Sequence, residues 1–169
     1  MRYIFVDGYN VINSWPELRN IKQHNFEGAR QALIDNIQEY ATFKGYKVFL
    51  VFDAHKVPAS IEKKEKIGNV IVVFTKEGET ADSYIEKKVN NIGRKKDVLV
   101  VTSDCLEQQV TFQRGATRMS SSEFYCEVNA VKSNIKHKTQ KQYSINKNWL
   151  EDSIDDKILE KLEKIRRNK

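Results

Sequence analysis

The stretch YIFVDGYN, residues 3–10, is the most informative about the fold of this chain. Its first residues, 3–6, are apolar without interruption, whereas a strand with one wet face would alternate apolar and polar side chains. Asp7 and Gly8 then place a carboxylate where the strand ends and a flexible residue where the chain turns. The stretch therefore predicts a strand of a parallel sheet, covered on both faces, with Asp7 at its carboxyl end.

Further apolar runs of strand length follow along the chain. They occupy residues 48–52, 70–74 and 98–101, with a weaker run at 116–119. Segments with helical spacing separate them, chiefly residues 26–41 and 81–92. Alternating strands and helices predict an open α/β sheet of about five mainly parallel strands, covered by helices on both sides in three layers.

Helix boundaries are also marked in the sequence. Asn25 and Thr80 are predicted caps at the starts of two helices, and Gly45 is placed to end the first. Ser120 with Glu123 matches the capping box that opens another helix. These residues predict where the helical segments begin and end.

Other segments are less regular. Residues 57–68 are rich in lysine and are predicted to be partly helical, and a short helix is expected from residue 103 or 104 to 115. Residues 132–147 hold five lysines and no acid, which predicts a mobile loop or a frayed helix. We therefore expect a domain at 1–130, followed at 131–169 by a basic segment and a C-terminal helix that extend it.

The composition indicates which kind of partner and which cellular location to expect. The chain has 169 residues, 40% of them hydrophobic, and a formal charge of +6, which favours a polyanionic partner without separating RNA, DNA, a ribosome or an anionic membrane. Cys105 and Cys126 lack paired metal-ligand spacing and are expected to be reduced thiols. The sequence shows no secretory signal, and its apolar runs are too short to span a bilayer. A cytoplasmic location without membrane contact is therefore expected.

Four acids are predicted to meet at one edge of the sheet. Asp7, Asp53 and Asp104 each follow a predicted strand. Asp82 lies in the first turn of a helix that the chain enters from the same edge. Ligands of open α/β sheets bind outside the carboxyl ends of the strands, where the strand order switches. Each acid alone also fits a turn or a favourable position at a helix start, but together they indicate a site.

Clustered carboxylates repel one another, so they either take up protons or gather cations. Oxygen ligands favour a hard ion such as Mg²⁺ or Mn²⁺, which also binds phosphate. Such an ion activates water and neutralises a leaving oxygen. The pattern therefore favours hydrolysis of phosphodiester bonds.

Three motifs carry a resemblance to a known family. DGYN at 7–10, ETADSYIE at 79–86 and TSD at 102–104 resemble the NYN domain of the PIN-like nuclease superfamily. With VFD at 51–53 and RMS at 118–120, the resemblance is to the YacP-like branch, over about residues 1–130. It implies a PIN-like fold and a metal-dependent endoribonuclease of single-stranded RNA, linked in this branch to mRNA cleavage in association with ribosomes.

The resemblance also assigns residues. It implies that Asp7, Asp82 and Asp104 are catalytic and bind the metal, and that Asn10 is a polar catalytic neighbour. PIN sites carry a further acid near the end of the fifth strand. Glu123 is one candidate for it, although the capping box explains this residue equally well.

Supporting groups and RNA contacts complete the prediction. Asp53, Thr80 and Ser103 are expected to orient the carboxylates, with turn or cap roles as the alternative. Base stacking is considered for Tyr9 and Trp15, which fit the core equally well. The lysines expected to contact phosphates, if they are more than solvated side chains, are Lys56, Lys76, Lys132, Lys136, Lys138 and Lys141.

Other activities are disfavoured by the motifs. The chain has neither a G-x-G-x-x-G fingerprint nor a Walker-type loop, so no nucleotide cofactor is expected, and it lacks a G-x-S-x-G elbow. Two rivals stay open. One is a non-catalytic RNA- or ribosome-binding module on a degenerate nuclease fold, and the other is a nuclease that cuts structured DNA.

Overall fold

A computed structural model describes residues 1–53, 63–92, 96–103, 116–153 and 164–165 of the chain. Clustering of backbone contacts divides the chain into two compact units, Met1–Val131 and Lys132–Lys169. The sheet and the helices around it belong to the first unit. In the described part of the chain, no helix is both long and apolar enough to cross a membrane.

Six strands form one sheet in the order β3-β4-β2-β1-β5-β6. All neighbouring strands are parallel except β3 and β4, so the predicted, mainly parallel α/β sheet is confirmed. Because the chain builds outward from β1 first through β2 and later through β5, the strand order switches between β1 and β5. The bounds are β1 (Tyr3–Asp7), β2 (Lys47–Phe52), β3 (Lys63–Ile67), β4 (Val70–Phe74), β5 (Val98–Val101) and β6 (Thr117–Met119).

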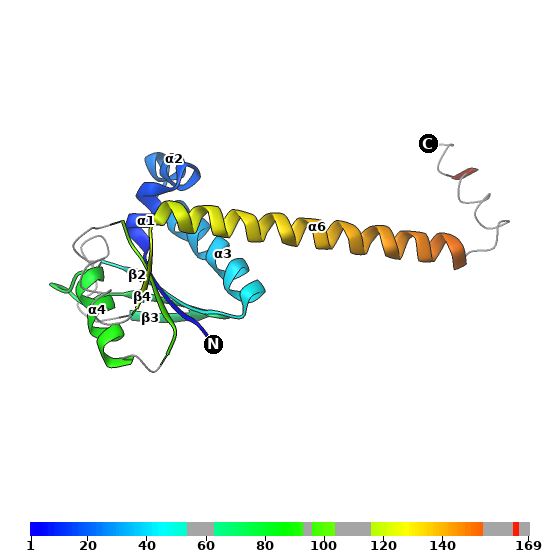
Figure 1. Cartoon of the computed structure of the whole chain (residues 1–169). Helices are drawn as coiled ribbons and strands as arrows, with labels where there is room; N and C mark the ends of the chain where they lie inside the picture. Colours follow the sequence, from blue (N-terminus) through cyan, green and yellow to red (C-terminus); the bar gives the residue numbers. More distant parts are fainter. Residues whose placement is uncertain (54–62, 93–95, 104–115, 154–163, 166–169) are drawn as a thin grey trace. The chain divides into compact units, whose positions relative to one another are not determined.

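Helices cover both faces of this sheet, as Figure 1 shows for α4 on one side and for α1 and α3 on the other. The sheet is thus the middle of three layers. The bounds are α1 (Gly8–Ser14), α2 (Pro16–His24), α3 (Phe26–Lys44), α4 (Ala81–Ile92) and α6 (Ser121–Ser153).

Burial on both faces explains the unbroken apolar runs. On β1, Ile4, Phe5 and Val6 are each no more than 1% exposed, although successive side chains point to opposite faces. Phe5 packs in the cluster that α4 covers, together with Tyr84 and Ile85 of that helix. Removing this apolar surface from water is the main force that holds the layers together.

The predicted caps are confirmed. The Asn25 side chain accepts a hydrogen bond from the Gly28 N–H at 2.8 Å, and Gly45 ends α3 in the left-handed conformation with φ 68°. The Thr80 hydroxyl accepts from the Ser83 N–H. At the start of α6, the Ser120 N–H donates to the Glu123 carboxylate, and the Glu123 N–H donates back to the Ser120 hydroxyl.

The structure differs from two local predictions. Residues 57–62 of the segment predicted to be partly helical lie outside the described residues, and in its described part β3 is an edge strand that pairs with β4 through a turn containing Gly68 at φ 57°. Pairing with β4 overrides the local pattern here, because lysines are well suited to an exposed sheet edge. The segment 132–147 was predicted to be a mobile loop or a frayed helix, and of these alternatives the loop is wrong, because the segment lies within α6. Its lysines and glutamines are good helix formers, and the capped first turn has already nucleated the helix.

Other segments were not tested or not foreseen. The helix expected at 104–115 and most of the one expected at the C-terminus lie outside the described residues. Neither α1 nor α2 was predicted, because Gly8 and Pro16 resemble turn residues in sequence. Proline is in fact favourable in the first turn of α2, where its missing N–H needs no partner.

We expect Gly8→Ala to destabilise the fold by about 1–3 kcal/mol, because an added Cβ would overlap the ring of Phe52. Urea unfolding measures this cost. Phe52→Leu supplies the matched background, since a smaller side chain leaves room for the methyl group. An equal cost of Gly8→Ala in both backgrounds would show that the ring is not the obstacle.

Candidate active site

Asp7 is fixed at the carboxyl edge of the sheet by the turn that follows it. It is the last residue of β1 and the N-cap of α1, and its Oδ1 accepts a hydrogen bond from the Asn10 N–H at 3.0 Å. Gly8 allows the chain to pass directly from strand to helix here, because it has no side chain and a Cβ at this position would overlap the Phe52 ring. Strand and helix together therefore hold the Asp7 carboxylate in a defined place.

Asp53 ties the end of β2 to the start of α4. It directly follows β2, and its Oδ1 accepts a hydrogen bond from the Ala81 N–H in the first turn of α4. The loop between β4 and α4 is braced as well, because the Thr75 N–H donates to the Phe52 carbonyl and the Thr75 hydroxyl donates to the Glu79 carbonyl. These bonds hold Asp82, the second residue of α4, at the same edge.

Two further acids, Asp53 and Asp82, act electrostatically on Asp7. The pKa of Asp7 is raised from 3.8 to about 6, chiefly by burial and also by the negative charges of Asp82 and Asp53, against the lowering effect of backbone hydrogen bonds from Asn10 and Tyr9. The structure thus brings together three of the four predicted acids. The fourth, Asp104, lies outside the described residues, next to Ser103 at the end of β5.

Whether the site suits a metal depends on its donors. Among the residues with described placement, no group of three His, Cys, Asp or Glu side chains is close enough to hold an ion. The predicted third ligand, Asp104, is outside that set. Asp7 and Asp82 supply the oxygen donors that Mg²⁺ and Mn²⁺ prefer, and the raised pKa of Asp7 marks negative charge that a cation would offset. The described residues therefore fit part of a divalent-cation site.

Asn10 belongs to a hydrogen-bond network centred on Ser121. Ser121 is fully buried, and its hydroxyl donates to Asn10 Oδ1 at 3.1 Å. Its N–H donates to the Ser103 hydroxyl at 3.4 Å, and its carbonyl accepts from the Trp15 indole at 2.9 Å. Sequence reasoning missed Ser121, and its one signal was its position just after the last strand.

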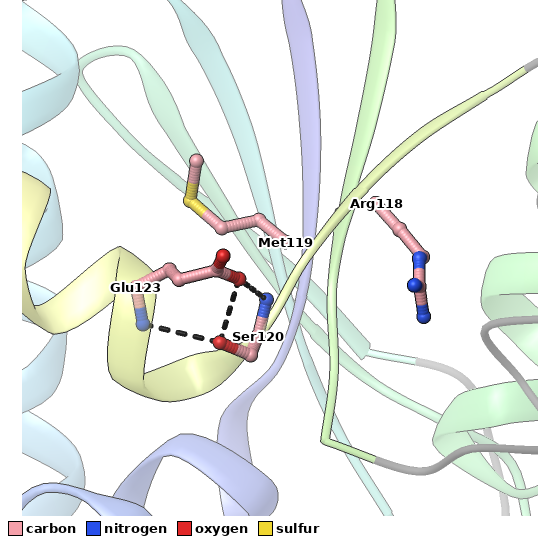
Figure 2. A pocket seen from close by; sticks show the side chains of 4 residues that line it. All are labelled: Arg118, Met119, Ser120 and Glu123. Atoms are coloured by element: carbon pink, nitrogen blue, oxygen red, sulfur yellow. Dashed lines mark hydrogen bonds between the residues drawn. The ribbon is translucent and has the colours of Figure 1, made fainter.

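A cavity of about 430 Å³ lies at the end of β6, lined by Arg118, Met119, Ser120 and Glu123 (Figure 2). The Glu123 carboxylate accepts from both the hydroxyl and the N–H of Ser120, at 2.7 and 2.8 Å. These bonds, and to a smaller extent the charge of Arg118, lower the pKa of Glu123. The capping interpretation of Glu123 is confirmed, and a metal-binding role gains no support.

The structure corrects two predicted RNA contacts. Trp15 is 2% exposed and packs on Phe124 and Tyr125, and Tyr9 is 9% exposed and packs on Phe26 and Phe52. Both rings therefore belong to the core, which was the alternative to base stacking, and their burial gives the stacking role no support, because a base needs an open ring face.

The predicted lysine contacts remain a prediction. Lys76 is exposed in the loop after β4, at the carboxyl edge of the sheet, and Lys56 lies outside the described residues. In the second unit, α6 carries Lys132, Lys136, Lys138 and Lys141, of which the last three are exposed.

Comparison with known proteins identifies the family of this chain. The model of the YacP-like NYN domain matches residues 4–167. The chain belongs to this family. It is 41% identical, over 170 residues, to the uncharacterized protein YacP of Bacillus subtilis (strain 168), and the match covers 99% of this chain and 98% of that protein. The family match extends beyond the motifs recognised in residues 1–130, into the C-terminal segment.

Solved structures agree. The crystal structure of Rae1 (YacP) from Bacillus subtilis superposes with a TM-score of 0.75 at 39% identity, over 99% of this chain and 95% of that one. A point mutant of the same protein gives 0.74 at 39% identity, over 85% of each chain. This member of the YacP-like NYN family therefore has a nuclease-type fold.

We expect Asp7→Asn to stabilise the metal-free protein at pH 8 but not at pH 4. Because the folded-state pKa is raised to about 6, the stability linked to Asp7 is full below the ordinary value of 3.8 and is lost as the pH rises through 6. The loss amounts to at most about 3 kcal/mol. Asparagine keeps the oxygen that caps α1 and removes the charge. Urea unfolding in EDTA measures the difference, and parallel pH profiles for the two proteins would contradict it.

We also expect Asp53→Ala to unfold more easily than Asp53→Asn, by about 1 kcal/mol. Both variants remove the charge, but only asparagine keeps an oxygen that can accept from the Ala81 N–H. The two midpoints of urea unfolding give the comparison at one pH. Equal midpoints would mean that this bond does not stabilise the start of α4.

Proposed function

We propose that this protein is a metal-dependent endoribonuclease that hydrolyses phosphodiester bonds in single-stranded RNA. The observation that carries the proposal is the convergence of Asp7, Asp53 and Asp82 at the carboxyl edge of the sheet, where Asp7 ends a strand beside the switch in strand order and has a raised pKa. Membership of a family with a nuclease-type fold supports it. The proposed catalytic and metal-binding acids are Asp7, Asp82 and Asp104, with Asn10 as a catalytic neighbour.

Each of these residues has a separate role in the proposed reaction. Asp7 and Asp82, with Asp104, would hold Mg²⁺ or Mn²⁺ through carboxylate oxygens. When bound, the ion would activate water and offset charge on the phosphate and the leaving oxygen. Asp53 would keep Asp82 in place through its bond to the Ala81 N–H, and the N-cap bond to Asn10 would keep Asp7 in place. The protein thereby contributes a fixed arrangement of negative charge.

We further propose that the substrate is mRNA associated with the ribosome, in the cytoplasm. This proposal rests on the resemblance of the motifs to the YacP-like branch and on the charge of +6, which suits a polyanion. Exposed lysines on α6 and in the loop after β4 supply some of this charge.

Cleavage of a labelled single-stranded RNA in Mg²⁺ or Mn²⁺ tests the proposal. We expect Asp7→Asn and Asp82→Asn to lower kcat/KM by about 100-fold or more, because each removes charge that stabilises the reacting centre. Asp35→Asn is the matched control, since it removes the same charge from an exposed acid on α3. We expect it to act like wild type, and EDTA to abolish cleavage by all proteins.

Equal activity of the wild type and both site variants would overturn the catalytic assignment. If the wild type does not cleave naked RNA, it is next compared with Asp7→Asn on translating ribosomes. If both bind there and neither cleaves, the protein is a binding module instead of an enzyme. Competition between RNA and branched DNA substrates separates the proposed activity from that of a DNA nuclease.

A further inference from the structure

The first residue of α6 joins three segments that surround the candidate site. Ser121 contacts Asn10 in α1 through its hydroxyl, Ser103 after β5 through its N–H, and Trp15 through its carbonyl. Its side chain is 0% exposed, so each bond is made away from competing water. The N–H of a first helical residue has no partner within its helix, and here the Ser103 hydroxyl supplies one. Ser121 is therefore held rigidly and can in turn hold what it contacts.

The residue that it holds is Asn10. An asparagine amide accepts hydrogen bonds at one end and donates at the other. Because Asn10 Oδ1 accepts from Ser121, the Nδ2 end points to a different side of the amide. The Asn10 N–H donates to Asp7, which fixes the backbone beside the acids. Asn10 is only half-buried and lies in the first turn of α1, three residues after Asp7 at this edge.

We propose that Ser121 is a positioning residue, which turns the Asn10 amide so that Nδ2 donates to a phosphate oxygen of the substrate. This inference rests on the proposed function. Asparagine side chains are frequent donors to nucleic-acid phosphates. Without the Ser121 hydroxyl, the amide is free to turn over and present its oxygen to the phosphate, which repels it.

The chemistry of a hydroxyl suits this location. Asp7, Asp53 and Asp82 already interact unfavourably at this edge. A carboxylate in place of Ser121 would add a further negative charge, which opposes the approach of a phosphate. A serine hydroxyl donates its hydrogen bond without adding charge. Ser121 thus orients the amide at no electrostatic cost to substrate binding.

A double-mutant cycle tests the proposal. It compares wild type, Asn10→Ala, Ser121→Ala and the double variant on one single-stranded RNA at saturating Mg²⁺. We expect Ser121→Ala to lower kcat/KM about 5- to 10-fold and Asn10→Ala by at least as much. The double variant should be no worse than Asn10→Ala, because Ser121 acts only through the amide. Ser122→Ala, the neighbouring exposed serine, is the matched control and should act like wild type.

Two results would overturn the proposal. One is an unchanged kcat/KM in Ser121→Ala, and the other is an equal loss with and without Asn10, which is what a purely structural role predicts. If Ser121→Ala does not fold, Ser121→Cys gives the same cycle, since a thiol is of similar size and a weaker donor. Urea unfolding of each protein separates losses of stability from losses of rate.

The cycle remains decisive if the proposed function fails. Should the wild type cleave no RNA, the Kd of a single-stranded RNA oligonucleotide replaces kcat/KM in the same four proteins. Weaker binding by both single variants, without further loss in the double variant, supports the contact. Equal Kd values for all four proteins exclude it. Failure of catalysis and failure of the amide contact therefore give different results.

Discussion

The constraint on which the structure depends is the placement of the Asp7 carboxylate. It is half-buried, it caps a helix, and two further negative charges, those of Asp53 and Asp82, act on it. Burial of a charge beside like charges is unfavourable, and the raised pKa of Asp7 expresses that cost. Such an arrangement persists because the surrounding fold is stable enough to hold it. The same electrostatic conflict is what makes the edge attractive to a cation and, through it, to a phosphate.

Packing contacts and hydrogen bonds together hold the carboxyl edge of the sheet in place. The Phe52 ring contacts Tyr9 and lies under the Arg30 guanidinium, so the end of β2 is anchored directly before Asp53. Hydrogen bonds then connect Asp53 to α4, and Asn10 to Ser121. Segments far apart in sequence are thereby fixed around one point. Catalytic groups gain from such rigidity because orientation is achieved before substrate arrives.

Much of the fold was predictable because its signals are local. An unbroken apolar run such as residues 3–6 shows that a strand is buried on both faces, and caps such as Asn25 mark a helix start through hydrogen bonds to nearby residues. The strand Lys63–Ile67 gave no such signal. Its side chains are mostly exposed and charged, and its conformation comes from pairing with β4, which no local pattern records.

For the candidate site, the order of acids and strands along the chain was enough to predict which acids share an edge with Asp7. The core position of Trp15 and the pairing of Ser121 with Asn10 became apparent only in the folded protein. Strand and helix periodicity fixes where a side chain leaves the backbone, whereas its burial and its hydrogen-bond partner depend on segments that meet only when the layers pack.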